Sequence, residues 1–412
     1  MYKIFIKKWI LVFVINTASL VIGLKNNLPG FFFLFWFTIV FTLINLFWIC
    51  LECLGSGISI TRKAQSKVDE EDTLHITTEI KIKSVIPLFN LVLTDYLSCA
   101  EDSNKNNTVL IDFFKAKSTT VILYNCICPL RGKYRIGPMC IYFFDPLGLF
   151  FIKKTFNIYS EVHVYPKAFN ILKFPSLSKG ILPWFGIETT RISGDDDDFF
   201  GVREYKPGDP IKRIHWALSA KKNSLIVKQY QRQSFYRVTI LFNLSNENNF
   251  GYGKESVAEY MIKIVASIAK YLLTRDVSVE VIAHAEEIVH LPFNRGMDHL
   301  EDIFRFLSIA RPESKIGLGE VFESFSHRIS DDSTLLTVLT DQDIVYLSQI
   351  ISLSARNISF IPVILLTHTF HPEARIGEGL AEKSSLIPEL NNVRPVYVYR
   401  GINWEELFSP YG

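Results

Sequence analysis

Residues 194–228 read GDDDDFFGVREYKPGDPIKRIHWALSAKKNSLIVK, and nowhere else does the chain combine charged, aromatic, Gly and Pro residues so densely. This mixture fits neither the alternation of a simple strand nor the one-sided pattern of an amphipathic helix. Asp209 followed by Pro210 is typical of a helix start, and the pattern predicts a helix with Asp209 as N-cap that runs to about Ala220. Asp209 and Arg213 lie four residues apart, a spacing at which opposite charges on a helix can pair.

The polar, aromatic and turn-forming residues of this stretch form the first candidate site. They are Asp198, Arg203, Glu204, Tyr205, Gly208, Asp209, Arg213, His215 and Trp216. One interpretation is a mainly structural polar network that holds the stretch against the domain that follows, with Tyr205 and Trp216 shielding it from water. The other interpretation is a working site for a partner or a reaction. A hydrolytic triad of His215, Asp209 and Ser219 is disfavoured, because triads usually gather residues from separate segments and the Gly-x-Ser-x-Gly elbow is absent.

After residue 236 the pattern alternates between strands and helices. Strands are predicted at 237–243, 277–283, 287–291, 334–339, 358–366 and 396–399, and helices at 256–274, 297–307, 319–328 and 344–353. Alternation of this kind predicts a doubly wound, mostly parallel α/β sheet.

The second candidate site follows from this sheet, because open α/β sheets bind ligands at the carboxyl ends of their strands. The first strand runs into 243–247, which reads NLSNE, and the fourth ends at Asp341. The arrangement resembles the von Willebrand factor A fold, which implies a Mg²⁺ site built from an Asp-x-Ser-x-Ser loop and a later Asp. Ser245 and Asp341 match that pattern, whereas Asn243 replaces the first Asp and Glu247 the last Ser. Mg²⁺ prefers carboxylate oxygens, so the sequence predicts a degenerate site with weak Mg²⁺ affinity and no required cofactor.

The N-terminus contains two apolar runs, Trp9–Leu24 and Phe31–Leu51, separated by a short turn. The second run is long enough to cross a hydrocarbon core of roughly 30 Å as a helix. Basic residues lie before the first run and after the second, and only Lys25 lies between them. The positive-inside rule therefore predicts a two-span hairpin in the inner membrane, with both ends and the bulk of the chain in the cytoplasm. The alternative, a cleaved signal peptide in residues 1–24, lacks a clear small-x-small cleavage site.

Between the membrane runs and the charged stretch the sequence is typical of β structure. Residues 74–83 alternate apolar and polar side chains, and further short runs occur at 88–93, 108–114, 119–124 and 140–144. The number of runs favours a β-sandwich over a ribbon attached to a larger domain. The chain has six cysteines: Cys50, Cys53, Cys99, Cys126, Cys128 and Cys140. A zinc site needs four well-placed ligands and no second C-x-x-C pair exists, so the cysteines are predicted to be small buried side chains.

The sequence of 412 residues therefore divides into five predicted parts. These are a two-helix membrane anchor at 1–54, a β-rich domain at 55–166, a signature segment at 167–236, an α/β domain at 237–400 and a tail at 401–412. The net charge of +2 gives no electrostatic footprint for nucleic acid.

Three strings identify relatives. They are RGKYRIGP at 131–138, DPLGLF at 145–150 and DFFGVREYKPGDPIKRIHW at 198–216. With these strings the chain resembles the bacterial domain-of-unknown-function family 58. The resemblance implies two N-terminal spans, a β region and a von Willebrand factor A-like domain. It also implies a genomic neighbourhood of MoxR-type AAA+ ATPases and transglutaminase-like membrane proteins. No reaction is established for the family.

The expected function is therefore that of a membrane-anchored cytoplasmic adaptor. It would work with a MoxR-type ATPase in the assembly or maturation of cell-envelope proteins, with a transglutaminase-like membrane protein as a further partner. The alternative from another class is an enzyme that uses Arg203, Glu204, Asp209 and His215. A pocket that gathers these side chains with perturbed pKa values would favour the enzyme. An exposed apolar or charged patch would favour the adaptor.

Overall fold

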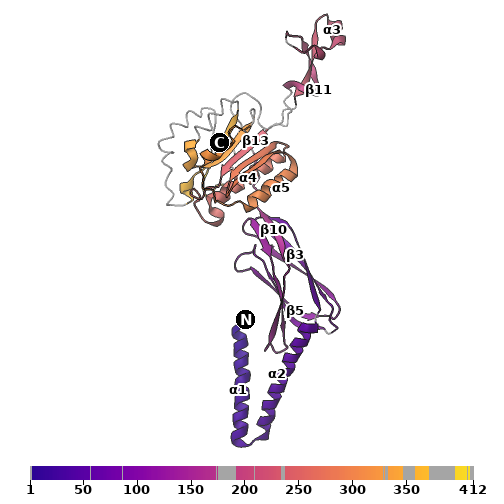
Figure 1. The fold of residues 1–412 in the computed structure, drawn as a ribbon, viewed down its shortest axis with the longest axis vertical. Coiled ribbons are helices and arrows are strands. Elements are labelled where there is room, and N and C mark those ends of the chain that lie inside the picture. The colour runs from indigo at the N-terminus through magenta and orange to yellow at the C-terminus, as the bar shows by residue number, and fades with distance from the viewer. Residues whose placement is uncertain are drawn as a thin grey trace. The chain divides into compact units, whose positions relative to one another are not determined.

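The computed structural model describes residues 2–55, 57–85, 87–172, 174, 192–207, 209–232, 237–327, 329, 333–346, 358–370, 395–405 and 407–408. The chain divides into two compact units, Met1–Pro166 and Lys167–Gly412. Each unit has its own buried cores, and their elements are labelled in Figure 1.

Two helices begin the first unit, α1 (Tyr2–Asn26) and α2 (Pro29–Gly55). Both are long and apolar enough to span a membrane, and most of their apolar side chains are exposed. They lie side by side as a hairpin (Figure 1), joined by a turn in which Asn27 has a φ of 49°. Polar contacts between them include the hydroxyl of Thr38, which donates to Asn16 Oδ1 at 2.5 Å.

The start of α1 is attached to the β part of the same unit. The indole nitrogen of Trp9 donates to the carbonyl of Leu149 at 2.8 Å, and its ring meets that of Phe150 edge to face at 5.2 Å. Lys8 Nζ donates to the carbonyl of Leu147 at 2.7 Å. The DPLGLF turn at 145–150 is itself closed by Asp145, whose carboxylate accepts from the backbone of Phe150. This string of the sequence therefore forms a docking point for the first helix.

Among the described residues of the first unit, ten strands follow α2. They are β1 (Ile58–Ala64), β2 (Lys67–Asp69), β3 (Thr73–Ile82), β4 (Leu88–Tyr96), β5 (Asn106–Phe114), β6 (Thr119–Ile127), β7 (Gly132–Ile136), β8 (Met139–Phe144), β9 (Phe151–Phe156) and β10 (Ser160–Tyr165). They form sheets in the orders β1-β3-β6, β2-β10-β7 and β5-β4-β8-β9. The first and last of these share one apolar core, with Ile80 from β3 packed among residues such as Leu91 and Ile141 from β4 and β8. The alternation expected at 74–83 is present, since inward side chains of β3 are buried at every second position.

An ion pair is buried within this unit. The guanidinium of Arg62 on β1 donates from Nη1 to both carboxylate oxygens of Asp95 on β4, at 2.8 and 3.0 Å, and neither side chain reaches solvent. Burial raises the pKa of Asp95, and the Tyr124 hydroxyl and Arg62 partly offset this effect. Gly137, with a φ of 108°, lies beside the pair, and a Cβ there would collide with the carbonyl of Ile158 and lie 2.9 Å from the guanidinium. The RGKYRIGP string thus supplies a glycine where the arginine needs room.

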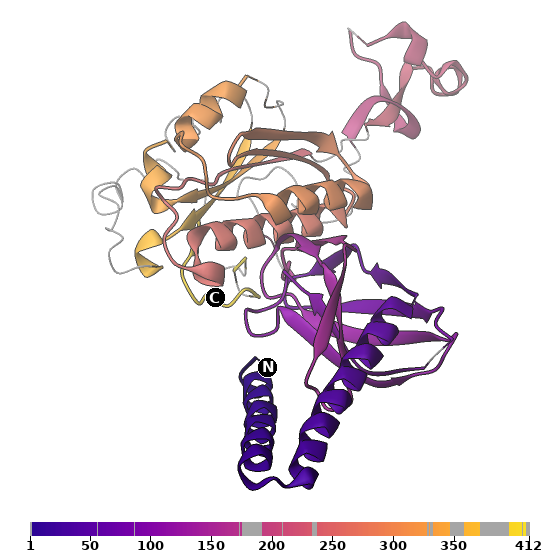
Figure 2. The same cartoon turned by 60° about the horizontal axis from the view of Figure 1, so that its bottom comes forward.

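The second unit contains a six-stranded sheet with helices on both faces (Figure 2). Its strands are β13 (Arg237–Asn243), β14 (Ser278–His284), β15 (Ile288–Asn294), β16 (Thr334–Thr340), β17 (Ser359–Leu365) and β18 (Val396–Val398), and its helices include α4 (Val257–Leu273), α5 (Gly296–Ile309) and α6 (Leu318–Phe325). The order is β15-β14-β13-β16-β17-β18, with β15 antiparallel to β14 and all other pairs parallel. Leu241 of β13 belongs to the core that α6 covers, whereas the next residue, Phe242, contacts Phe306 of α5.

The predicted alternation of strands and helices in 237–400 is therefore present among the described residues. Ser256 is the N-cap of α4, and its side chain accepts from the backbone N–H of Glu259. The helix thus begins close to where the sequence pattern at 256–274 predicts. The predicted helix at 344–353 differs from the structure. The stretch after β16 is the 3₁₀ helix η3 (Asp341–Tyr346) rather than an α-helix that starts at 344. Residues 347–353 lie outside the described part.

Candidate functional site

The charged stretch forms a two-stranded hairpin, here called the signature hairpin (192–232). Strand β11 (Ile192–Glu204) pairs antiparallel with β12 (Ile226–Arg232), and both are visible beside the label β11 in Figure 1. The register shifts between Gly194 and Phe199, both opposite Tyr230, so the intervening run of Asp residues forms a bulge in β11. Asp198 belongs to this bulge. Its side chain, like the whole of Gly208, lies outside the described part of the chain.

A forked ion pair closes the turn that follows β11. Arg203 Nη1 donates to Asp209 Oδ2 and Arg203 Nη2 to Asp209 Oδ1, each at 2.6 Å. The backbone N–H of Lys206 also donates to Asp209 Oδ2, at 2.8 Å, and Arg203 reaches the carbonyl of Glu204 at 3.0 Å. The hydrogen bond from Arg203 holds the pKa of Asp209 below its usual value. Two-point contact of this kind fixes geometry as well as charge, so the pair sets the shape of the turn at 203–209.

The helix expected from Pro210 to Ala220 is not continuous. A 3₁₀ turn, η1 (Ile211–Arg213), is followed by the separate helix α3 (Trp216–Lys222). The N-cap of η1 is Pro210 and not Asp209. The carboxylate of Asp209 is held by Arg203 and by the Lys206 backbone, and it pairs with Arg203 rather than Arg213.

Strand pairing interrupts the predicted helix. Ile214 forms a bridge with Val227, and the backbone N–H of His215 donates to the carbonyl of Ile226 at 2.8 Å. The N-cap of α3 is His215, whose Nδ1 accepts from the backbone of Leu218 at 3.3 Å. The backbone at 214–215 is therefore committed to β12, which a helix running through these residues could not allow.

The expected shielding of the polar residues by Trp216 is wrong. Trp216 is 62% exposed and Ile211 is 67% exposed, and Val202 and Leu225 are exposed as well. Tyr205 is half-buried. The signature hairpin thus exposes four large apolar side chains among its described residues.

Ser219 has a structural role that rules out the triad. It is buried on α3, and its Oγ accepts from the backbone N–H of Ile226 at 2.8 Å. His215 Nδ1 faces the backbone of Leu218 at the start of the same helix. Neither group is arranged as a nucleophile with its base.

The second candidate site lies at the carboxyl ends of β13 and β16, where the strand order of the sheet reverses. Asn243 ends β13 and its Nδ2 donates to the carbonyl of Ile316 at 2.8 Å. Asp341 follows β16, is buried, and accepts at Oδ1 from the hydroxyl of Thr367 at 2.6 Å. Two oxygens, Asn243 Oδ1 and Asp341 Oδ2, are buried without a hydrogen bond among the described residues. His368 Nδ1 lies 3.7 Å from that Asp341 oxygen.

Another carboxylate at this edge was not predicted. Asp343 accepts at Oδ2 from the Thr340 hydroxyl at 2.6 Å and from its backbone at 3.2 Å, and Asn248 lies 3.4 Å from the other oxygen. Burial raises the pKa of Asp343, and the neighbouring Asp341 adds to the effect. The Asp-Gln-Asp sequence directly after a buried strand was the available signal.

These residues fit a Mg²⁺ site poorly. Mg²⁺ needs a nearly octahedral set of oxygens at close to 2 Å, and the edge offers one uncommitted carboxylate oxygen and one uncommitted amide oxygen. The other oxygen of Asp341 is held by Thr367, and the carboxylate of Asp343 by Thr340. The edge is therefore better described as a hydrogen-bonded polar cluster than as a metal centre.

Comparisons with known proteins cover both candidate sites. Residues 201–363 match the model of the family described as "Protein of unknown function DUF58". Over 291 residues the chain is 22% identical to the uncharacterized protein YeaD of Bacillus subtilis (strain 168), an alignment that covers 68% of this chain and 69% of YeaD.

Solved structures add little. The CARDB domain of the PF1109 protein from Pyrococcus furiosus, in complex with di-metal ions, is 18% identical, covers 26% of this chain and 93% of its own, and has a TM-score of 0.20. A beta-glucosidase from Listeria innocua is 11% identical, covers 27% of this chain and 16% of its own, and has a TM-score of 0.17. Likenesses this low carry no argument about fold or function. The match to the DUF58 family model, at residues 201–363, spans the Arg203–Asp209 pair and the carboxyl edge of the sheet.

Proposed function

We propose that the protein is a membrane-anchored adaptor that binds a protein partner through the signature hairpin. This proposal rests on the different roles of the polar and the apolar side chains within residues 202–225. The polar side chains Arg203 and Asp209 hold the turn, whereas the aromatic and aliphatic side chains, Trp216 and Ile211 above all, are exposed. Exposed Trp and Arg side chains on a shaped element are typical of the residues that dominate protein–protein binding.

An enzyme using the same residues has less support. A general base or acid must be able to reach a substrate proton. Both oxygens of Asp209 are held by Arg203, and the Nδ1 of His215 caps α3. Exposed apolar side chains beside polar groups that are already engaged in local hydrogen bonds support binding over catalysis.

The proposed setting is the inner membrane, with α1 and α2 as a two-span anchor and the rest of the chain in the cytoplasm. The α/β unit is proposed to be von Willebrand factor A-like. What supports this is the sheet order, with a single antiparallel edge strand, and the polar cluster at the carboxyl ends of its first and fourth strands. The proposed partner is a MoxR-type AAA+ ATPase, with a transglutaminase-like membrane protein as a further component, in the assembly or maturation of cell-envelope proteins. The choice of partners rests on the family resemblance.

Binding measurements with a purified MoxR-type AAA+ ATPase test this proposal. The full chain is held in detergent or nanodiscs, and its affinity for the ATPase is compared with that of Trp216→Ala. Loss of a central aromatic anchor costs about 2 kcal/mol, or roughly thirty-fold in affinity. Met297→Ala is the matched control, because Met297 is an equally exposed apolar residue on α5. The control should bind like wild type.

The same variants must keep their melting temperatures. Because Trp216 is exposed, its truncation should leave the folded state intact. If Trp216→Ala binds the ATPase as tightly as wild type, the hairpin is not the docking element. If wild type itself does not bind, the choice of ATPase is wrong.

A further inference from the structure

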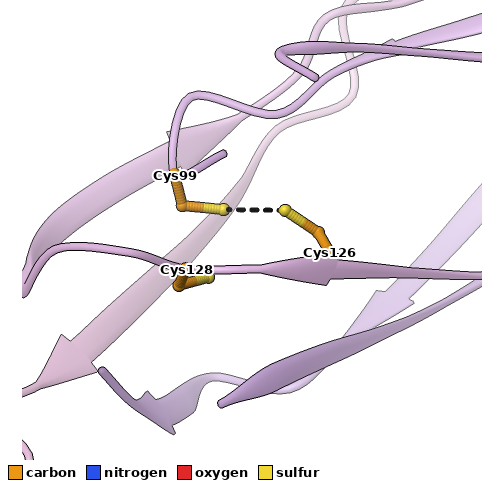
Figure 3. Close-up of side chains that lie close together, drawn as sticks. All are labelled: Cys99, Cys126 and Cys128. Carbon is orange, nitrogen blue, oxygen red and sulfur yellow. Dashed lines mark hydrogen bonds between the residues drawn. The ribbon is translucent and has the colours of Figure 1, made fainter. Parts of the chain in front are cut away.

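Three cysteines of the first unit converge in space. Cys99 follows β4, Cys126 lies on β6 and Cys128 directly follows β6. Figure 3 shows the sulfurs of Cys99 and Cys126 facing each other, with Cys128 near them. The three Sγ atoms lie within 4.8 Å of one another, and those of Cys99 and Cys126 are 3.9 Å apart. All three side chains are buried and none is in a disulfide.

The backbone fixes each of these positions. Cys126 and Cys128 are two residues apart on an extended segment, so their side chains share one face. Pairing of Cys126 with Leu74 sets the register of that face, and Cys128 is held by backbone hydrogen bonds to Glu71 at 2.8 Å and Asp72 at 3.4 Å. Cys99 lies in a tight turn that follows β4, which is a strand of another sheet. The backbone N–H of Ala100 closes this turn by donating to the carbonyl of Leu97 at 3.1 Å. The site is thus built from two rigid segments rather than from one flexible loop.

The surroundings are apolar. The cluster lies in a core whose other members include Leu74, Leu97, Ile136 and Val162. Such a pocket excludes water and disfavours charged thiolates unless a cation compensates them.

The spacing matches metal–thiolate geometry. A Zn–S bond of about 2.3 Å in a tetrahedral array places neighbouring sulfurs about 3.8 Å apart, and the Cys99–Cys126 separation of 3.9 Å is close to that value. A disulfide would require the two sulfurs to approach to about 2.05 Å and an oxidant to accept two electrons. Thiolate ligands select soft or borderline cations such as Cu⁺ and Zn²⁺ over Mg²⁺ or Ca²⁺.

We propose that Cys99, Cys126 and Cys128 form a three-thiolate site for a thiophilic d¹⁰ cation, Zn²⁺ or Cu⁺. On binding, each S–H bond is replaced by a sulfur–metal bond, and up to three protons are released to solvent. Three thiolates carry three negative charges, so bound Zn²⁺ leaves one net negative charge in the pocket and bound Cu⁺ leaves two. Charge therefore favours Zn²⁺, whereas a site with three ligands favours Cu⁺. The bound ion cross-links the β4 turn to β6. This site is independent of the adaptor function proposed above.

Metal titration of the purified full chain tests the site. The protein is prepared in detergent under reducing conditions, with Cys50, Cys53 and Cys140 changed to Ser so that only the cluster thiols remain. Zn²⁺ and, anaerobically, Cu⁺ are each titrated in competition with a chromophoric chelator. We expect one equivalent of at least one metal to be retained, and Cys126→Ser to weaken its binding at least a hundred-fold. In the native background Cys140→Ser is the matched control, because Cys140 is also buried in this unit, 3.7 Å from the hydroxyl of Thr155.

X-ray absorption of the metal-loaded wild type gives a second readout that does not depend on a variant that folds. Three sulfur neighbours around the metal support the site. A shell of nitrogen and oxygen alone overturns it. Absence of bound metal in both arms, equal affinity in Cys126→Ser, or a protein mass two units lower from a Cys99–Cys126 disulfide in the purified chain also overturns it.

Discussion

The buried pair of Arg62 and Asp95 shows how much one residue can matter in the first unit. Both side chains are inaccessible to solvent, and the guanidinium also donates to the carbonyl of Ile136 at 3.1 Å. Removing one member of a buried ion pair leaves the other charge stranded, which costs about 3–5 kcal/mol. We therefore expect Asp95→Ala to lower the melting temperature of this unit strongly. Thermal unfolding of the full chain, followed by circular dichroism, measures the effect.

Asp102→Ala is the control for that experiment. Asp102 also pairs with a cation, Lys105, but its side chain is almost fully exposed, and such pairs contribute little to stability. If Asp95→Ala and Asp102→Ala melt at the same temperature, the buried pair does not stabilise the unit.

His284 gives a prediction about pH. It ends β14, is buried, and its Nδ1 lies 2.6 Å from Ser314 Oγ. Burial lowers the pKa of His284 below its ordinary value of 6.5. The folded state therefore binds fewer protons than the unfolded state in this range, and its stability falls as the pH drops through and below 6.5. Between pH 7.5 and 5.5 the melting temperature of wild type should fall more than that of His284→Asn, because asparagine does not titrate. An equal loss in both would show that His284 does not contribute.

Contacts between individual residues were the feature hardest to predict from the sequence. Arg62 was visible from the sequence only as one of the basic residues after the second apolar run. Its partner Asp95 lies 33 residues away on another sheet, and no local pattern joins the two. The same applies to the thiol cluster. Cys126 and Cys128 are close in the sequence, but Cys99 reaches them only through the packing of two sheets. Contacts of this kind depend on the tertiary structure, which periodicity does not encode.

At the scale of elements, periodicity predicted the strands and helices well where one face is buried, as in β3 and α5. The prediction failed at 210–220, where a continuous helix was expected from the N-cap signal at Asp209. Asp209 binds Arg203, six residues earlier, and 214–215 bond to β12. The local preference for a helix start was overridden by pairing with a strand that comes later in the chain.

The carboxyl edge of the α/β sheet is predicted to bind Mg²⁺ too weakly to matter at physiological concentration. The edge lacks a carboxylate at position 243, where Asn243 is held by the carbonyl of Ile316. Titration calorimetry on the full chain in detergent should show little heat for wild type and a clear gain in affinity for Asn243→Asp. Asn246→Asp adds the same charge at an exposed neighbouring position and should not reproduce the gain. Micromolar binding by wild type that Asp341→Ala abolishes would contradict this prediction.

For the whole molecule the central prediction is its topology. Basic residues flank the helical hairpin on both sides, and Lys25 is alone in the turn, so both ends of the chain are expected in the cytoplasm. A cysteine placed at Asn26 should react with a membrane-impermeant reagent on intact cells. A cysteine placed at Met297, which is exposed on α5, should react only after the membrane is opened. The opposite pattern would reverse the orientation.

The attachment of Trp9 and Lys8 to the turn at 145–150 has a mechanical consequence in a bilayer. A domain joined to its anchor by one linker can swivel about that linker. Here α2 leads directly toward β1 while the start of α1 is fastened to a second point of the same β unit, and two points define an axis. If the two helices form the proposed membrane anchor, rotation of the β unit about the membrane normal would be coupled to rotation of both helices together. A pull on the chain would then turn the helix pair as a whole rather than being absorbed at a single linker.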